Sequence, residues 1–144
     1  MGKIKKLRVV PFEIEHLEML RLRDFETYRA DYNSVYGKGI GYSAFDDQVL
    51  IFCAGFVFLW EGVAETWILC DKCVIHYIRE LYYYVASYLD RIISKYNLHR
   101  IQATVLAEYL PGRRFLGRMG FREEGLLRKY DWNGRDYFMY SRVM

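Results

Sequence analysis

The longest stretch of regular spacing in the chain lies between residues 74 and 96, where apolar side chains recur every three or four positions. They are Val74, Ile78, Leu81, Val85, Leu89, Ile92 and Tyr96. This spacing places them on one face of an amphipathic α-helix, and Asp71 stands where a residue that caps the helix start is expected. The pattern predicts one long helix that buries a single side.

Runs typical of β-strands flank this helix. Residues Ala64–Leu69 precede it, and Arg100–Val105 follow it with Ile101, Ala103 and Val105 in alternation. A strand, a helix and a second strand predict a right-handed crossover that joins two parallel strands. We therefore expect these two strands to lie next to each other.

Shorter elements are predicted before and after this crossover. Before it we expect a strand at Leu7–Val10, a helix through Ile14, Leu17 and Leu20, a second helix at Phe25–Tyr32, and antiparallel strands at Ser43–Ala44 and Val49–Phe58 that turn at Asp46-Asp47. After it we expect a helix from Pro111 to Gly120 and a hairpin of Leu126–Trp132 and Asp136–Val143 around Asn133-Gly134. Proline suits a first helical turn, glycine suits the residue after a helix, and Asn-Gly is a strong hairpin signal.

Composition narrows the class of protein. The 144 residues are 53% hydrophobic and carry a net charge of +3, so we expect one folded domain over residues 1–144 rather than a disordered chain. This mild excess of positive charge does not call for nucleic acid as a partner. No apolar run approaches about 18 residues, the length of a membrane-spanning helix. We therefore expect a cytoplasmic protein without membrane contact.

Two short motifs resemble functional sites, and we interpret them otherwise. Residues Tyr36–Gly41 resemble a phosphate-binding loop, but such a loop opens a helix and a strand-like run follows here. Cys70 and Cys73 form a C-x-x-C motif with His76 and Cys53 as further candidate ligands, yet no second closely spaced pair exists. We expect a flexible connector at the first motif and no metal at the second.

The segment with the most specific sequence is Arg114–Gly125, which reads RFLGRMGFREEG. It resembles the helix and following GF-x-x-E-G motif of the GNAT superfamily of N-acetyltransferases, and the predicted order of elements is similar over nearly the whole chain. The resemblance implies an α/β (α+β) fold with the order β-α-α-β-β-β-α-β-α-β-β. Its central mixed, twisted sheet has about six to seven strands, with helices on both faces.

Three other segments resemble GNAT-like proteins of tailed phages and prophages, among them small internal virion proteins. The segments are Arg23–Glu26, Gly55–Trp67 and Gly134–Tyr140. This resemblance implies a location in the host cytoplasm or the virion, and phage virion proteins as partners.

The GNAT resemblance implies acetyl-CoA as the cofactor, held between the two parallel strands, and a small-molecule or protein primary amine as the acceptor. The residues implied in cofactor binding lie on the first strand, at the start of the long helix and on the short helix: Trp67, Ile68, Leu69, Lys72, Cys73, Val74, His76, Tyr77, Arg79 and Arg114. Backbone N–H groups and the positive end of a helix dipole both attract a pyrophosphate.

Glu65 and Tyr109 are the implied catalytic residues. Glu65 stands two residues before Trp67 on the same strand, where a carboxylate can take the proton of an attacking amine. Many family members have a tyrosine proton donor at the position of Leu116. Since leucine stands there, we expect Tyr109 in that role, with Tyr77 as the alternative.

The cofactor loop departs from the family pattern, because residues 71–79 contain no glycine. Each Cβ atom crowds an approaching phosphate, and Asp71 adds a negative charge. The sequence thus leaves two hypotheses open. The protein is either an active acetyltransferase or a non-catalytic GNAT-fold protein, of phage or prophage type, that works through protein contacts. The acceptor and the oligomeric state stay open.

Overall fold

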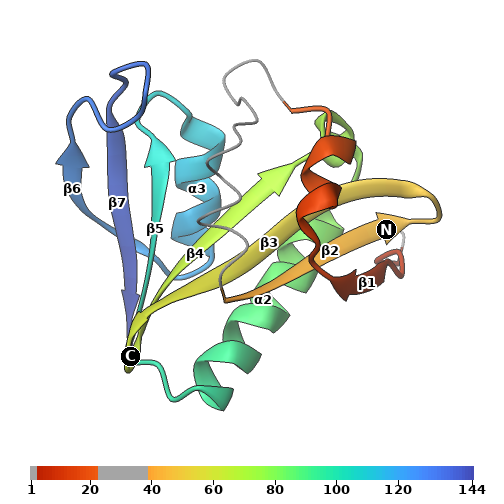
Figure 1. The fold of residues 1–144 in the computed structure, drawn as a ribbon, viewed down its shortest axis with the longest axis horizontal. Helices are drawn as coiled ribbons and strands as arrows, with labels where there is room; N and C mark the ends of the chain where they lie inside the picture. The colour runs from red at the N-terminus through yellow and green to blue at the C-terminus, as the bar shows by residue number, and fades with distance from the viewer. Residues whose placement is uncertain (1–2, 23–38) are drawn as a thin grey trace. The chain divides into compact units, whose positions relative to one another are not determined.

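The computed structural model describes residues 3–22 and 39–144. Its elements, drawn in Figure 1, are β1 (Arg8–Pro11), the 3-10 helix η1 (Ile14–Met19), β2 (Ile40–Asp46), β3 (Val49–Trp60), β4 (Val63–Cys70), the 3-10 helix η2 (Lys72–His76), α2 (Ile78–Lys95), β5 (Arg100–Leu106), α3 (Leu110–Arg118), β6 (Arg122–Leu127) and β7 (Tyr137–Val143). The predicted helix at Phe25–Tyr32, the motif at Arg23–Glu26 and residues 36–38 lie outside the described residues.

The strands of the described residues form one mixed sheet in the order β1-β2-β3-β4-β5-β7-β6. β4 and β5 pair in parallel through Val63–Arg100, Ala64–Ile101 and Glu65–Gln102. The pairs β1–β2, β2–β3, β5–β7 and β6–β7 are antiparallel. The predicted parallel pair on either side of a long helix is therefore confirmed, and so is the predicted mixed sheet of about six to seven strands, which has seven.

The chain divides into two compact units, and the first comprises residues 1–58 and 66–91. Tyr42 and Cys53 point to opposite faces of its antiparallel strands, since Tyr42 pairs with Ala54 and Cys53 pairs with the next residue along β2. On one face the Tyr88 ring of α2 stacks on Tyr42, with ring centroids 4.5 Å apart. On the other face Leu17 of η1 packs in a cluster with Cys53. Both faces of this unit are thus covered.

The second unit comprises residues 59–65 and 92–144. Residues of β5 alternate in burial: Ile101 and Ala103 are buried, whereas Gln102 is half-buried. Helix α3 packs beside β5, as Figure 1 shows, and its Arg113 guanidinium lies 4.5 Å from the centroid of the Phe138 ring of β7. Gln102 of β5 and its partner Ser141 of β7 lie on the opposite face. The prediction of a single domain stays a prediction.

Two helices differ from their predictions. The segment at Ile14 forms a six-residue 3-10 helix instead of three α-helical turns, because its buried positions, Leu17 and Leu20, follow the three-residue period of a 3-10 helix. The long helix starts later than expected, at Ile78. Asp71 does cap a helix, but that helix is η2, and the chain turns at Tyr77 before α2 begins.

The C-terminal hairpin also differs in its strand boundaries. β6 ends at Leu127 rather than Trp132, and residues 128–136 form the connection to β7. The carboxylate of Asp131 accepts hydrogen bonds from the backbone N–H groups of Asn133 and Arg135 and from the Arg135 guanidinium. Such local bonds compete with strand pairing, so the turn at Gly134, which has a φ of 72°, closes a long loop instead of a two-residue one.

Candidate functional site

Glu65 occupies the last β4 position in the parallel register with β5, while β4 itself continues to Cys70. Its side chain is half-buried, and its Oε1 accepts a hydrogen bond of 3.0 Å from Nε2 of Gln102, its partner across the strands. Tyr130 lies close by. Its burial and the Glu65 charge raise the pKa of Tyr130, and a hydrogen bond with Thr104 opposes this. The carboxylate of the predicted base is therefore fixed by a hydrogen bond from Gln102 and has Tyr130 as an aromatic neighbour.

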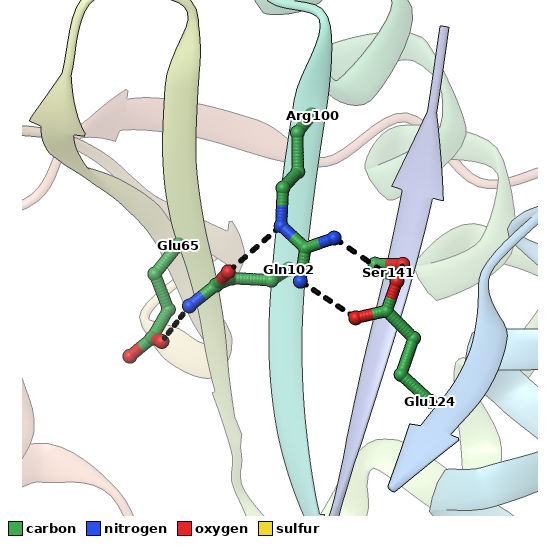
Figure 2. Close-up of polar contacts among 5 residues, drawn as sticks. All are labelled: Glu65, Arg100, Gln102, Glu124 and Ser141. Carbon is green, nitrogen blue, oxygen red and sulfur yellow. Dashed lines mark hydrogen bonds and ion pairs between the residues drawn. The ribbon is translucent and has the colours of Figure 1, made fainter.

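The contact with Glu65 is the end of a longer row of polar side chains on β4, β5, β7 and β6. Figure 2 shows the row. Arg100 donates from Nε to Oε1 of Gln102 at 3.0 Å, and from Nη1 and Nη2 to the two oxygens of Glu124 at 3.0 and 2.7 Å. Ser141 donates its hydroxyl to the same Glu124 carboxylate. Arg100 and Ser141 together lower the pKa of Glu124 to about 2.

Tyr109, the predicted proton donor, stands just before α3 as its N-cap. Its backbone carbonyl accepts the N–H of Arg113 at 3.2 Å, and its half-buried ring lies against Gly112, where a Cβ atom would come within 2.7 Å of the ring. Leu116 is buried on the same helix, whereas Arg114 is exposed. The structure thus gives Tyr109 a defined place beside α3, and its role stays a prediction.

The β4 residues predicted to bind the cofactor differ in how far their side chains are buried. Trp67 is buried, and its ring centroid lies 5.0 Å from that of Phe12 in the cluster under η1. Leu69 is buried and Ile68 is half-buried. The indole of Trp67 therefore belongs to the core. Only backbone atoms of this part of β4 fit the predicted role.

The loop between β4 and α2 uses many of its own backbone N–H groups. The N–H of Cys73 donates to the Asp71 carboxylate, that of Val74 to the Asp71 carbonyl, and that of Tyr77 to the Val74 carbonyl. The N–H of Lys72 donates to the carbonyl of Arg21. These three N–H groups therefore donate within the chain, and the roles of Cys73, Val74 and Tyr77 in cofactor binding stay predictions.

Asp71 does not present its charge to this loop's surface. Its side chain is 3% exposed and forms an ion pair with Arg21, with 2.9 Å between Oδ2 and Nη2. Burial alone would raise the pKa of Asp71, but hydrogen bonds from Arg21 and Cys73 outweigh burial and set the pKa to about 2. The expected repulsion of a phosphate by Asp71 is thus weakened by the positive charge of Arg21, whose own side chain is exposed.

The cations predicted near the pyrophosphate remain at the surface. Lys72, His76 and Arg79 are exposed beside the first turn of α2, an 18-residue helix whose positive end favours anions. The hydroxyl of Tyr77 is already used, because it donates to Asp46 at 2.6 Å. Lys72, His76 and Arg79 are thus exposed near the positive end of α2, and their predicted role towards the phosphates of acetyl-CoA stays a prediction.

The cysteines are poorly placed for chemistry. Cys53 and Cys70 are buried and Cys73 is half-buried. Burial raises the pKa of the Cys53 thiol to about 11, and burial together with the Asp71 carboxylate raises that of Cys73 to about 11 as well. Within residues 3–22 and 39–144, no cluster of three or more His, Cys, Asp and Glu side chains is placed to bind a metal ion. In the same residues no helix has the length and hydropathy to cross a membrane.

No protein-family model and no curated protein matches the sequence. Solved structures do match. A variant of spermidine N-acetyltransferase from Vibrio cholerae has a TM-score of 0.72 and 17% identity, with 95% of each chain covered. A Bacillus subtilis acetyltransferase in complex with CoA has a TM-score of 0.74 and 18% identity over 96% of this chain and 99% of that one. A GNAT-family acetyltransferase from Bacillus anthracis has a TM-score of 0.71 and 19% identity over 98% and 96%. This chain has the GNAT fold.

These neighbours are bacterial enzymes, and they lend no support to the resemblance to phage proteins. Within the GNAT fold, the row of Figure 2 contains four residues that the sequence did not single out for the site: Arg100, Gln102, Glu124 and Ser141. The alternation along β5 could have indicated Arg100 and Gln102, because these polar residues alternate with the apolar Ile101 and Ala103. That alternation marks a polar face, but the partners on it depend on strand register.

Proposed function

We propose that this protein is an acetyltransferase that transfers the acetyl group of acetyl-CoA to a primary amine. The observation that carries the proposal is the Glu65 carboxylate, which is half-buried at the end of the parallel β4–β5 register and held by Gln102. The GNAT fold over nearly the whole chain supports it. Fold alone does not fix an activity, so the carboxylate and its surroundings carry the argument.

Each residue has a stated role in the proposed reaction. When bound, acetyl-CoA supplies a thioester, whose acetyl carbon forms a bond to the amine nitrogen while its bond to sulfur breaks. Glu65 accepts the proton of the attacking amine, directly or through one water molecule. Tyr109 gives a proton to the departing thiolate. Lys72, His76, Arg79 and Arg114 attract the phosphates, and backbone atoms of Trp67–Leu69 bind the arm of the cofactor.

Calorimetry with acetyl-CoA and a Glu65→Gln variant test this function. We expect saturable binding of acetyl-CoA to the wild-type protein and release of CoA when primary amines are supplied. Glu65→Gln keeps the size of the side chain but removes the base, so kcat should fall about 100-fold or more while acetyl-CoA still binds. Glu61→Gln, at an exposed position on the turn after β3, is the matched control and should retain full activity.

A second function follows from a different observation. The N–H groups of Cys73, Val74 and Tyr77 are already bonded within the chain, and a GNAT-fold protein that binds no cofactor needs none of them free; the second candidate is therefore a non-catalytic protein that works through protein contacts. Absence of acetyl-CoA binding at millimolar concentration, together with equal behaviour of Glu65→Gln and Glu61→Gln, would favour this alternative over the enzyme.

A further inference from the structure

The polar row of Figure 2 has a fixed order across four strands. Glu65 on β4 pairs with Gln102 on β5, and Gln102 pairs with Ser141 on β7. Glu124 reaches the same row from β6, next to the register shift between Glu123 and Gly125. Arg100 lies two residues before Gln102 and so on the same face of β5. The strand register therefore brings these side chains together, whatever the sequence distance between them.

The direction of the Gln102 amide follows from its two neighbours. A guanidinium has only N–H donors, so only the carbonyl oxygen of Gln102 can face Arg100, as it does at 3.0 Å. The amide NH₂ must then point the other way, to Glu65 at 3.0 Å. A flipped amide would set N–H against N–H at one end and oxygen against oxygen at the other. Arg100 thus selects the orientation that donates to Glu65.

Arg100 is itself held on its other side. Two of its nitrogens bind the two oxygens of Glu124, a bidentate arrangement that fixes the plane of the guanidinium as well as its position. Ser141, which is 4% exposed, donates to Glu124 and holds that carboxylate in turn. The low pKa of Glu124, about 2, keeps the carboxylate charged at all ordinary pH values. The anchor is therefore permanent rather than dependent on pH.

We infer that Gln102 is a positioning residue for Glu65 and that the Arg100–Glu124 pair is the anchor that orients the Gln102 amide. The inference rests on the proposed function for the role of Glu65 as a base. Its structural part, an amide held rigid by Arg100, stands without any activity. A base must stay close to its productive geometry, and displacement by about 1 Å can cost about 100-fold in rate. Gln102 supplies that constraint through its hydrogen bond to Glu65, without taking part in the reaction itself.

Relaxation of side-chain amide signals in the NMR spectrum tests the anchor without cofactor. We expect the Gln102 NH₂ group of the wild-type protein to be as rigid as the backbone, and the exposed Gln48 NH₂ group in the same spectrum to be mobile. Arg100→Lys removes the bidentate pair and the Nε donor, so the Gln102 signal should become mobile while Gln48 is unchanged. A Gln102 amide that is mobile in the wild type, or that stays rigid in Arg100→Lys, would overturn the inference.

Steady-state kinetics test the consequence for Glu65. In Gln102→Leu we expect kcat to fall about 10- to 100-fold, with the KM for acetyl-CoA changed by less than about twofold. Gln48→Leu is the matched control and should leave kcat unchanged. A merely structural Gln102 would lower the free energy of unfolding and leave the kcat of the folded protein intact, which would refute the positioning role. If the wild-type protein transfers no acetyl group, the proposed function fails, whereas the amide signal still reports on the anchor.

Discussion

The Asp71 carboxylate accepts four hydrogen bonds, three from the backbone and guanidinium of Arg21 and one from the N–H of Cys73. Together they outweigh the effect of burial and set the pKa of Asp71 to about 2. An aspartate in an unfolded chain has a pKa of about 3.9. Because the folded-state pKa is the lower one, ionised Asp71 stabilises the fold above pH 4, and this stabilisation is lost as the pH falls towards 2.

Urea unfolding between pH 7 and pH 2.5 measures this effect. We expect the wild-type free energy of unfolding to fall in acid, with about 2 kcal/mol of the loss due to Asp71. Asp71→Asn should be less stable at pH 7 and should lose less stability in acid than the wild type. The control is Asp47→Asn, at an exposed turn position with a φ of 55° that asparagine tolerates. Equal pH dependence of the two variants would contradict the assignment.

The same residue scale shows what the sequence could reveal of the candidate site. Glu65 could be proposed from the sequence because its position on a predicted strand is a local property. Its partner Gln102 is 37 positions away, and Arg21 is 50 positions from Asp71, so both contacts depend on register and loop paths that spacing does not encode. Trp67 was assigned to the cofactor through its backbone, and the structure places its ring in the core, which leaves that assignment a prediction.

Among the elements, β3 shows how a glycine fits close packing. A Cβ atom at Gly55 would lie 2.5 Å from the Ile40 carbonyl oxygen and 2.7 Å from the Trp67 ring. Gly55 allows a close approach and not a bulge, since the register shift of β2 and β3 lies elsewhere, between Ala44 and Phe45. Strand and helix types were predictable from periodicity, whereas their ends followed local hydrogen bonds such as those of Asp131.

A pair of glycine substitutions tests the packing of β3. Gly55→Ala should lower the free energy of unfolding by about 1–3 kcal/mol, because neither a backbone carbonyl nor a buried indole can move away easily. Gly117→Ala in α3 meets no atom within 4 Å and should raise it by up to about 1 kcal/mol, because alanine favours the helix. Chemical unfolding of both variants against wild type gives the comparison. A neutral Gly55→Ala would show that the strand is packed more loosely than described.

At the scale of the whole molecule, three elements belong to both compact units. The first unit contains residues 49–58 of β3, 66–70 of β4 and 78–91 of α2, and the second contains residues 59–60, 63–65 and 92–95 of the same elements. A strand or helix cannot easily unfold over half its length, because its hydrogen bonds form cooperatively. We therefore propose that the chain is one domain in the thermodynamic sense.

Fluorine NMR of protein labelled with 5-fluorotryptophan can test this cooperativity. Trp67 reports on the unit with residues 66–91, and Trp132 reports on the unit with residues 92–144. We expect both native signals to disappear at the same urea concentration, with equal slopes, as in a two-state transition. Separate midpoints for the two tryptophans would show two independently unfolding units and would contradict the single domain.

The three thiols of the chain bear on how turnover can be followed. Cys53 and Cys70 are shielded from solvent, and the pKa values of Cys53 and Cys73 are raised to about 11, so these two side chains are almost entirely protonated at neutral pH and react slowly with electrophiles. A chromogenic disulfide reagent in the reaction mixture would therefore react with the thiol of released CoA and hardly with the thiols of the folded protein. Continuous absorbance recording with low background is thus within reach for screening large collections of candidate acceptors.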